Sequence, residues 1–229
     1  MKLKVKICGI TNIEDARLAL DLGADELGFV LAPSPRRIEA EALRSLIEAI
    51  RARGDARVFR MVGVFVNEKA NAMRDIISFT GLDIAQIHGD ETPAACAAFG
   101  FPWYRALRMG SVADAERLSA ESWACARLLV DAAVPSLYGG TGVSVGTWAA
   151  LAAGRFSREK GKEFFVAGGI GPRNVASVIH SLAPDGIDVS SGVEERPGKK
   201  SRDKLEALFG QIEKATTACE AEGNKHAAR

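Results

Sequence analysis

The stretch LKVKICGITNIEDARLALDLGADELGFVL, residues 3–31, contains the pattern that decides the fold. Two short apolar segments, residues 3–8 and 26–31, flank a longer segment, residues 12–22, whose apolar side chains recur at helical spacing. Short runs of this composition are typical of strands buried on both faces. Residues 3–31 therefore predict a strand, a crossover helix and a second strand parallel to the first.

The same alternation continues along the chain. The expected strands are residues 3–8, 26–31, 57–66, 83–87, 103–107, 126–131, 163–167 and 186–190. The expected helices are residues 12–22, 40–52, 68–79, 92–99, 111–121, 146–155, 172–182 and 202–215. This alternation predicts an α/β fold, a single-domain (β/α)8 TIM barrel over residues 1–215. An open doubly wound sheet also alternates, but no Gly-x-Gly-x-x-Gly follows the first strand.

Composition narrows the class of protein. The chain has 229 residues, 47% of them hydrophobic, which suits one barrel-sized domain. With 30 basic and 29 acidic side chains, the net charge of +1 argues against a strong nucleic-acid binder. The sequence shows neither a membrane-spanning apolar run nor a signal-peptide pattern, so we expect a cytoplasmic protein. Residues 216–229 are polar and charged, and we expect them to fray as a C-terminal tail.

The metal-binding residue types are sparse. The cysteines Cys8, Cys96, Cys125 and Cys219 include no Cys-x-x-Cys pair, and the chain has three histidines. A zinc site is therefore not expected, and free thiols are the simpler interpretation. Because motifs for nucleotide or redox cofactors are also missing, we expect neither a metal nor a cofactor.

In (β/α)8 barrels the active site lies where the strands end, in the loops that follow them. Cys8 and Asp131 end the first and sixth expected strands, so they are candidates for a general base and a general acid. From position alone, Cys8 could equally be a buried structural thiol, and Asp131 a turn or cap residue. His88 ends the fourth strand, where a structural hydrogen-bonding role is the alternative to substrate binding.

The loops supply candidate binding groups for an anion. Two prolines stiffen the loop of residues 32–38, which could hold Arg36 or Arg37 against a carboxylate. Glycine-rich loops follow strands six, seven and eight, and barrel phosphate sites often use the last two. Their alternative role is to make tight turns only. The candidates in these loops are Gly142, Gly169, Gly171, Asp188, Ser190, Ser191 and Gly192.

Several of these motifs together resemble one family. KICGIT at residues 6–11 resembles the opening motif of phosphoribosylanthranilate isomerases of tryptophan biosynthesis. GVFVN at 63–67, QIHG at 86–89, GGTG at 139–142, GGI at 168–170, DVSSGVE at 188–194 and PGKK at 197–200 follow in the family's order. The resemblance extends over about residues 4–209. The segments at residues 132–134 and 143–148 depart from the family pattern, which affects details of the loop after strand six.

The resemblance implies an Amadori rearrangement of N-(5′-phosphoribosyl)anthranilate to 1-(2-carboxyphenylamino)-1-deoxyribulose 5-phosphate. It implies that Cys8 is the general base and Asp131 the general acid. It also implies that Arg36 binds the carboxylate group of the anthranilate. The glycine-rich loops would hold the phosphate. Asp131 must then begin the reaction protonated, so we expect its pKa to be raised by burial.

Two alternative functions remain. The first is the related aminoaldose isomerase of histidine biosynthesis, whose barrel carries an aspartate at the end of strand one, where this chain has Cys8. The second is a non-catalytic barrel that binds a sugar phosphate. In each case the partner is a small phosphorylated molecule rather than nucleic acid or membrane. We expect a monomer, with a homodimer as the alternative.

Overall fold

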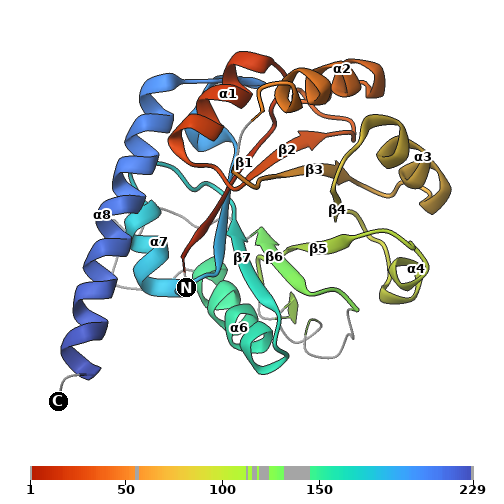
Figure 1. Ribbon diagram of the computed structural model, residues 1–229. Helices are drawn as coiled ribbons and strands as arrows, with labels where there is room; N and C mark the ends of the chain where they lie inside the picture. The colour runs from red at the N-terminus through yellow and green to blue at the C-terminus, as the bar shows by residue number, and fades with distance from the viewer. Residues whose placement is uncertain are drawn as a thin grey trace.

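The computed structural model describes residues 2–54, 57–111, 113–114, 118, 124–131 and 145–227. Within these residues, eight strands close into one barrel in the order in which they occur along the chain. Figure 1 shows the strands at the centre and the helices outside them. The predicted (β/α)8 barrel is confirmed.

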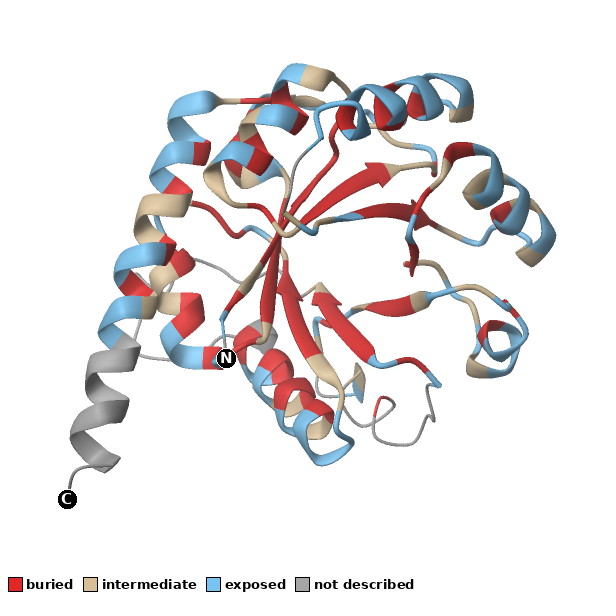
Figure 2. Cartoon of the chain, viewed as in Figure 1, coloured by how far each residue is buried: buried red, intermediate tan, exposed pale blue. Residues whose placement is uncertain are grey.

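The barrel strands are all parallel to their neighbours, and β8 pairs with β1 to close the ring. In this register Lys6 lies opposite Asp188, and Cys8 lies opposite Gly28. Figure 2 shows that the strands are almost entirely buried, as their apolar composition predicts. The bounds are β1 Lys4–Cys8, β2 Glu26–Val30, β3 Arg60–Phe65, β4 Ile84–Ile87, β5 Trp103–Arg108, β6 Arg127–Asp131, β7 Glu163–Ala167 and β8 Gly186–Val189.

The outer helices follow the predicted positions closely. Their bounds are α1 Ile13–Leu22, α2 Ala40–Arg51, α3 Ala70–Thr80, α4 Pro93–Ala97, α6 Val145–Glu159, α7 Val175–Leu182 and α8 Arg202–Ala227. The helix expected at residues 111–121 lies largely outside the described residues. Helix α7 begins at Val175 rather than at residue 172, because Asn174 closes a turn by accepting a hydrogen bond from the Gly171 N–H. No described helix is both long and apolar enough to cross a membrane.

Local signals fix the first βα unit. The Asn12 side chain accepts a hydrogen bond from the Asp15 N–H at 2.9 Å and so caps the start of α1. Gly23 ends the helix with a φ of +113°, a conformation that glycine adopts at little cost. These two residues explain why the chain turns sharply on each side of α1.

Helix α8 continues beyond residue 215, where we expected the helix to end. The hydroxyl groups of Thr216 and Thr217 donate to the carbonyl oxygens of Ile212 and Glu213 one turn earlier. Figure 1 shows α8 beside α7 and α1, with its last turns extending past the barrel. Fraying of the chain after residue 215 stays a prediction.

A short hairpin that the sequence analysis did not predict follows β8. The 3₁₀ helix η1 (Ser191–Val193) leads into β9 (Glu194–Arg196) and β10 (Lys199–Lys200). Asp15 holds the hairpin on α1 by accepting bonds from Lys199 Nζ at 2.9 Å and from the Lys200 N–H at 2.7 Å. Strands of two or three residues are too short to give a periodic signal, which is why the sequence did not predict them.

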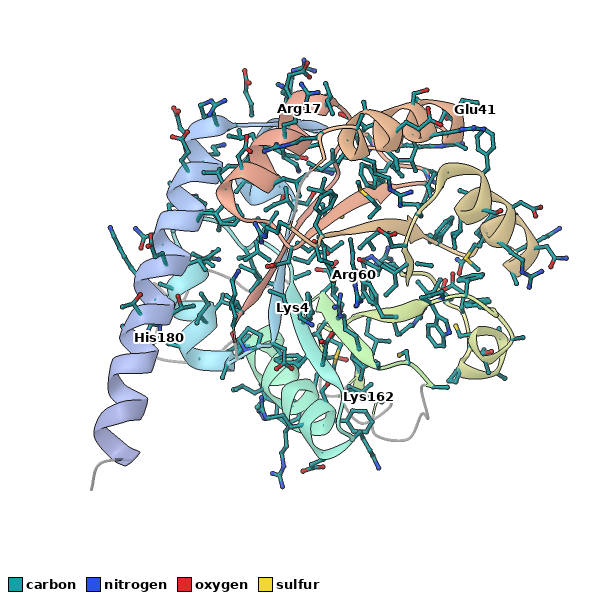
Figure 3. All side chains as sticks on the ribbon, in the orientation of Figure 1. Lys4, Arg17, Glu41, Arg60, Lys162 and His180 are labelled. Atoms are coloured by element: carbon teal, nitrogen blue, oxygen red, sulfur yellow. The ribbon has the colours of Figure 1, made fainter. Side chains whose placement is uncertain are left out.

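The N-terminal ends of the strands are held by ion pairs. Buried Arg127 donates from Nη1 to both carboxylate oxygens of Glu26 at 2.8 Å, and from Nε to Glu163 at 2.8 Å. Its guanidinium also lies 3.9 Å from the centre of the Phe165 ring. Glu163 receives a further bond from Lys4, which Figure 3 labels at the start of β1.

Candidate active site

A cavity of about 460 Å³ opens at the C-terminal ends of the strands, where the sequence predicts the site. Eight of the eleven residues proposed from the sequence line it. They are Cys8, Arg36, His88, Asp131, Gly169, Asp188, Ser190 and Ser191. The parallel register brings these side chains together from six different strand ends and loops.

Cys8 ends β1 with its side chain buried against the neighbouring strand β2. An added Cβ at Gly28 would lie 2.7 Å from the Cys8 Sγ, so only glycine leaves room for the sulfur there. Burial raises the pKa of the Cys8 thiol above its ordinary value, and the neighbouring Lys6 ammonium acts in the opposite direction. Cys8 is therefore a free thiol whose ionisation depends on the charges around it.

Asp131 and His88 lie next to each other in the cavity wall, at the ends of β6 and β4. Their Oδ2 and Nε2 atoms are 3.5 Å apart. Burial raises the pKa of Asp131, although positive charge at His88 would act to lower it. Burial also lowers the pKa of His88, which favours the neutral imidazole. Asp131 is thus suited to hold a proton and to donate it, as the sequence analysis requires.

Arg36 is the arginine of its loop that reaches the cavity. Its Nε donates to Glu194 Oε1 at 2.8 Å, and its Nη2 donates to Oε2 at 2.6 Å. Lys200 Nζ also donates to Glu194 Oε1, at 3.0 Å. Although burial would raise it, these hydrogen bonds lower the pKa of Glu194, so its carboxylate stays charged and fixes the Arg36 guanidinium. Arg37 instead pairs with exposed Glu39 on the surface.

The two late glycine-rich loops touch each other behind the cavity wall. An added Cβ at Gly192 would lie 1.9 Å from the Ile170 carbonyl oxygen, so the loops can approach this closely only without a side chain there. Gly171 packs against Gly192, and its N–H is already bonded to Asn174. Neither Gly171 nor Gly192 is among the lining residues, whereas Gly169 is. Gly142 lies outside the described residues.

Polar residues in or beneath the cavity that we did not propose from the sequence include Lys6, Gln86 and Arg108. Lys6 lies fully buried below Cys8, Gln86 lines the cavity from β4, and Arg108 lines it from the end of β5. The alternation of side chains along a strand was the available signal, since Lys6 is two residues before Cys8 and points to the same face. Arg108 was missed because the fifth strand was expected to end one residue earlier.

A larger hollow, of about 890 Å³, lies at the opposite end, between the start of β1 and helix α8. Its carboxylates Asp25 and Asp185 accept hydrogen bonds from the backbone N–H groups of Val5 and Phe164, both at 2.8 Å. They are therefore used to hold the strand ends. Polar groups of the kind that act on a substrate converge at the C-terminal cavity instead.

The fold and the cavity together define a class of protein. The cavity holds a carboxyl group whose pKa is raised by burial, a thiol and a fixed arginine, which suits acid–base chemistry on a small anionic molecule. In the part of the chain that the structure describes, no three His, Cys, Asp or Glu side chains are grouped as a metal site requires. The protein is thus of the class of (β/α)8-barrel enzymes that move protons within a bound substrate.

Comparisons with known proteins identify the family. The sequence profile of N-(5′-phosphoribosyl)anthranilate (PRA) isomerase matches residues 5–211. The N-(5′-phosphoribosyl)anthranilate isomerase of Magnetococcus marinus is 39% identical over 217 residues, which cover 94% of this chain and 97% of that relative. The crystal structure of phosphoribosyl anthranilate isomerase from Thermotoga maritima matches with a TM-score of 0.77 and 33% identity, covering 93% of this chain and 99% of that one.

A further structure of the isomerase was determined in complex with reduced 1-(o-carboxyphenylamino)-1-deoxyribulose 5-phosphate. It matches with a TM-score of 0.75 and 30% identity, again covering 93% of this chain and 99% of the other. The chain belongs to the N-(5′-phosphoribosyl)anthranilate isomerase family. The resemblance noted from the motifs is thereby confirmed.

Proposed function

We propose that this protein catalyses the Amadori rearrangement of N-(5′-phosphoribosyl)anthranilate to 1-(2-carboxyphenylamino)-1-deoxyribulose 5-phosphate, a step of tryptophan biosynthesis. Membership of the isomerase family supports this reaction. The observation that carries the residue assignment is that Cys8 and Asp131, from well-separated strands, line the same cavity. A substrate between them can exchange protons with both.

Asp131 is the general acid in this proposal. Ring opening requires a proton on the ribose ring oxygen while the bond from that oxygen to C1′ breaks and the substrate nitrogen forms a protonated imine. The raised pKa of Asp131, caused by burial, keeps a proton available for this step. His88 lies 3.5 Å from the carboxyl group, and as a neutral ring it contacts the substrate.

Cys8 is the general base. The protonated imine makes the C2′ proton acidic, and the Cys8 thiolate removes it, which gives an enolamine. Protonation at C1′ and loss of the C2′ hydroxyl proton then complete the ketone product. Because burial raises the pKa of Cys8 even though the Lys6 and Lys200 ammonium groups act to lower it, the active thiolate is a minority form at neutral pH.

The remaining lining residues bind the two ends of the substrate. Arg36, held by Glu194, contacts the anthranilate carboxylate through a charge-assisted hydrogen bond. The phosphate is bound by the loops after β7 and β8, where η1 directs its N-terminal end to the cavity wall at Ser191. Gly142, Gly169 and Ser190 contribute to this phosphate site, and Asp188 lines the cavity as a hydrogen-bond acceptor for a hydroxyl group of the substrate. Gly171 and Gly192 let the two loops meet.

A fluorescence assay with freshly made phosphoribosylanthranilate tests the function. Loss of substrate fluorescence on addition of the protein, and its absence with folded Cys8→Ala, is the expected result. Turnover of the histidine-pathway aminoaldose instead would identify the related isomerase. Binding of a product analogue without any turnover would identify a barrel that only binds sugar phosphates.

We also propose that the protein acts in the cytoplasm as a monomer and needs no cofactor. The near-neutral net charge of +1 leaves a homodimer as the alternative assembly. Light scattering during size-exclusion chromatography distinguishes the two, since a single species of about 24.4 kDa is expected for the monomer.

A further inference from the structure

Lys6 carries a positive charge in the interior of the barrel, one layer below the cavity, and the proposed reaction steps do not use it. Its side chain has no exposed surface. Burying a lone ammonium costs several kcal/mol, so such a group is retained only with close partners. Lys6 Nζ donates to Asp188 Oδ2 at 2.7 Å and to Gln86 Oε1 at 2.8 Å. These two partners fix the position of the charge.

The fixed ammonium lies beside the Cys8 sulfur. Lys6 and Cys8 are two residues apart on β1, so their side chains point to the same face. Both reach over Gly28, where an added Cβ would lie 2.7 Å from Cys8 Sγ and 3.0 Å from Lys6 Nζ. Gly28 thus leaves the space in which the thiol and the ammonium meet.

Other charges near Cys8 have different partners. Lys200 Nζ, from β10, donates to the Cys8 carbonyl oxygen at 2.6 Å and to Glu194 at 3.0 Å. Arg36, from the β2–α2 loop, is bound through two of its nitrogens to the same Glu194. Asp188, from β8, acts against ionisation of the thiol. Lys6 is therefore the cation placed against the sulfur itself, on the same face of the same strand.

We propose that Lys6 is a positioning residue whose ammonium group stabilises the thiolate form of Cys8. This inference rests on the proposed role of Cys8 as general base. Burial raises the pKa of Cys8, and Lys6 opposes that shift more strongly than the other neighbouring charges do. Although burial would lower it, Asp188 and Cys8 raise the pKa of Lys6 well above its ordinary value, so the ammonium stays charged.

The test measures ionisation of Cys8 without using the substrate. The native protein and Lys6→Met are alkylated with iodoacetamide between about pH 6 and 11, and modification of the Cys8 peptide is followed by mass spectrometry. A nearby opposite charge shifts a pKa by about one to three units, so Lys6→Met should alkylate roughly 10- to 1,000-fold more slowly near pH 8. The midpoint of the Cys8 titration in Lys6→Met should therefore lie at a higher pH than in the native protein. A change of packing alone would alter only the alkylation rate that is reached at high pH.

Lys4→Met is the matched control. It removes the same charge from the same strand, but Lys4 lies four residues before Cys8 and pairs with Glu163 at the other end of the barrel. We expect its Cys8 midpoint to equal that of the native protein. If Lys6→Met does not fold, Lys6→Gln replaces it, because the glutamine amide can still donate a hydrogen bond to Asp188 but carries no charge. Lys6→Gln should also show a raised midpoint.

An unchanged midpoint in folded Lys6→Met, or in folded Lys6→Gln, would overturn the inference. An equal shift in Lys4→Met would also overturn it. The pH profile of turnover separates this outcome from failure of the proposed function. If phosphoribosylanthranilate is converted but the midpoint does not move, Lys6 has no such role while the function stands. If the midpoint moves without any turnover, Lys6 governs Cys8 in a protein with another activity.

Discussion

The two ends of the barrel both contain buried charged groups, but they use them differently. At the N-terminal end, Arg127 has two carboxylate partners and an aromatic ring against its face. At the C-terminal end, within the residues described, His88 Nε2 and Asp188 Oδ1 are buried without a hydrogen-bond partner. Asp131, whose pKa is raised by burial, also lies at this end.

This difference separates stability from function. A buried polar group that has its partners stabilises the fold, and one that lacks a partner destabilises it by about 1–3 kcal/mol. The C-terminal end retains such atoms where a substrate can supply the missing hydrogen bonds. We therefore expect substitutions at the C-terminal end of the barrel to change turnover. We expect substitutions at the N-terminal end to change the free energy of unfolding.

The largest effect is expected for Asp131→Asn. Asparagine keeps the size of the side chain but cannot donate the acidic proton, so kcat should fall by about 10²–10⁴-fold. Steady-state fluorescence kinetics measure the loss, and circular dichroism verifies the fold. Turnover at the native rate would remove Asp131 from the mechanism.

Arg127→Met should have the largest effect on stability. It leaves Glu26 buried without its main partner, which costs about 3–5 kcal/mol in the free energy of unfolding. Denaturant titration measures this loss, while kcat of the folded fraction should stay at the native value. A marked fall in kcat with unchanged stability would reverse the proposed division between the two ends.

Arg36→Ala should raise KM by about 10- to 100-fold, because a hydrogen bond to a charged group contributes about 1.5–3 kcal/mol. The matched control is Arg37→Ala, which removes the neighbouring arginine that pairs with Glu39 on the surface. Substrate titrations of both variants decide the assignment. Equal KM values for the two would mean that Arg36 does not bind the carboxylate.

Asp83→Ala tests a smaller contact at the N-terminal end. Asp83 Oδ2 accepts a hydrogen bond from the buried Met61 N–H at 2.7 Å, and its loss should destabilise the fold by about 1–3 kcal/mol. Asp83→Asn retains an acceptor oxygen and should lose less. Thermal and denaturant unfolding compare the two variants, and identical losses would show that this hydrogen bond is not the cause.

The smallest effect is the pH dependence of stability contributed by Asp131. Burial raises its pKa in the folded state, so the folded protein holds this proton at pH values where the unfolded chain has released it. Stability therefore falls as pH rises from the ordinary aspartate pKa through the raised one. Asp131→Asn should remove this loss and be more stable than the native protein at neutral pH, but not at pH 3. Unfolding titrations at both pH values check the direction.

Periodicity explains how much of the site was predictable. Cys8, Asp131 and His88 follow apolar runs directly, so strand ends could be located from the sequence and the barrel then placed these residues together. The Arg36–Glu194 pair joins residues 158 apart through a hairpin that is too short to give a pattern. Strand alternation could have placed Lys6 on the same face as Cys8, but its partners Asp188 and Gln86, which hold the buried charge, are distant in the sequence.

The most direct test of the division between the two ends of the barrel measures kcat on phosphoribosylanthranilate and the free energy of unfolding in two variants, Asp131→Asn and Arg127→Met. We expect Asp131→Asn to lose at least about 10²-fold in kcat while remaining as stable as the native protein or more so. We expect Arg127→Met to keep the native kcat and to lose stability. If kcat and the free energy of unfolding both fell in each variant, the separation of a catalytic end from a stabilising end would be contradicted.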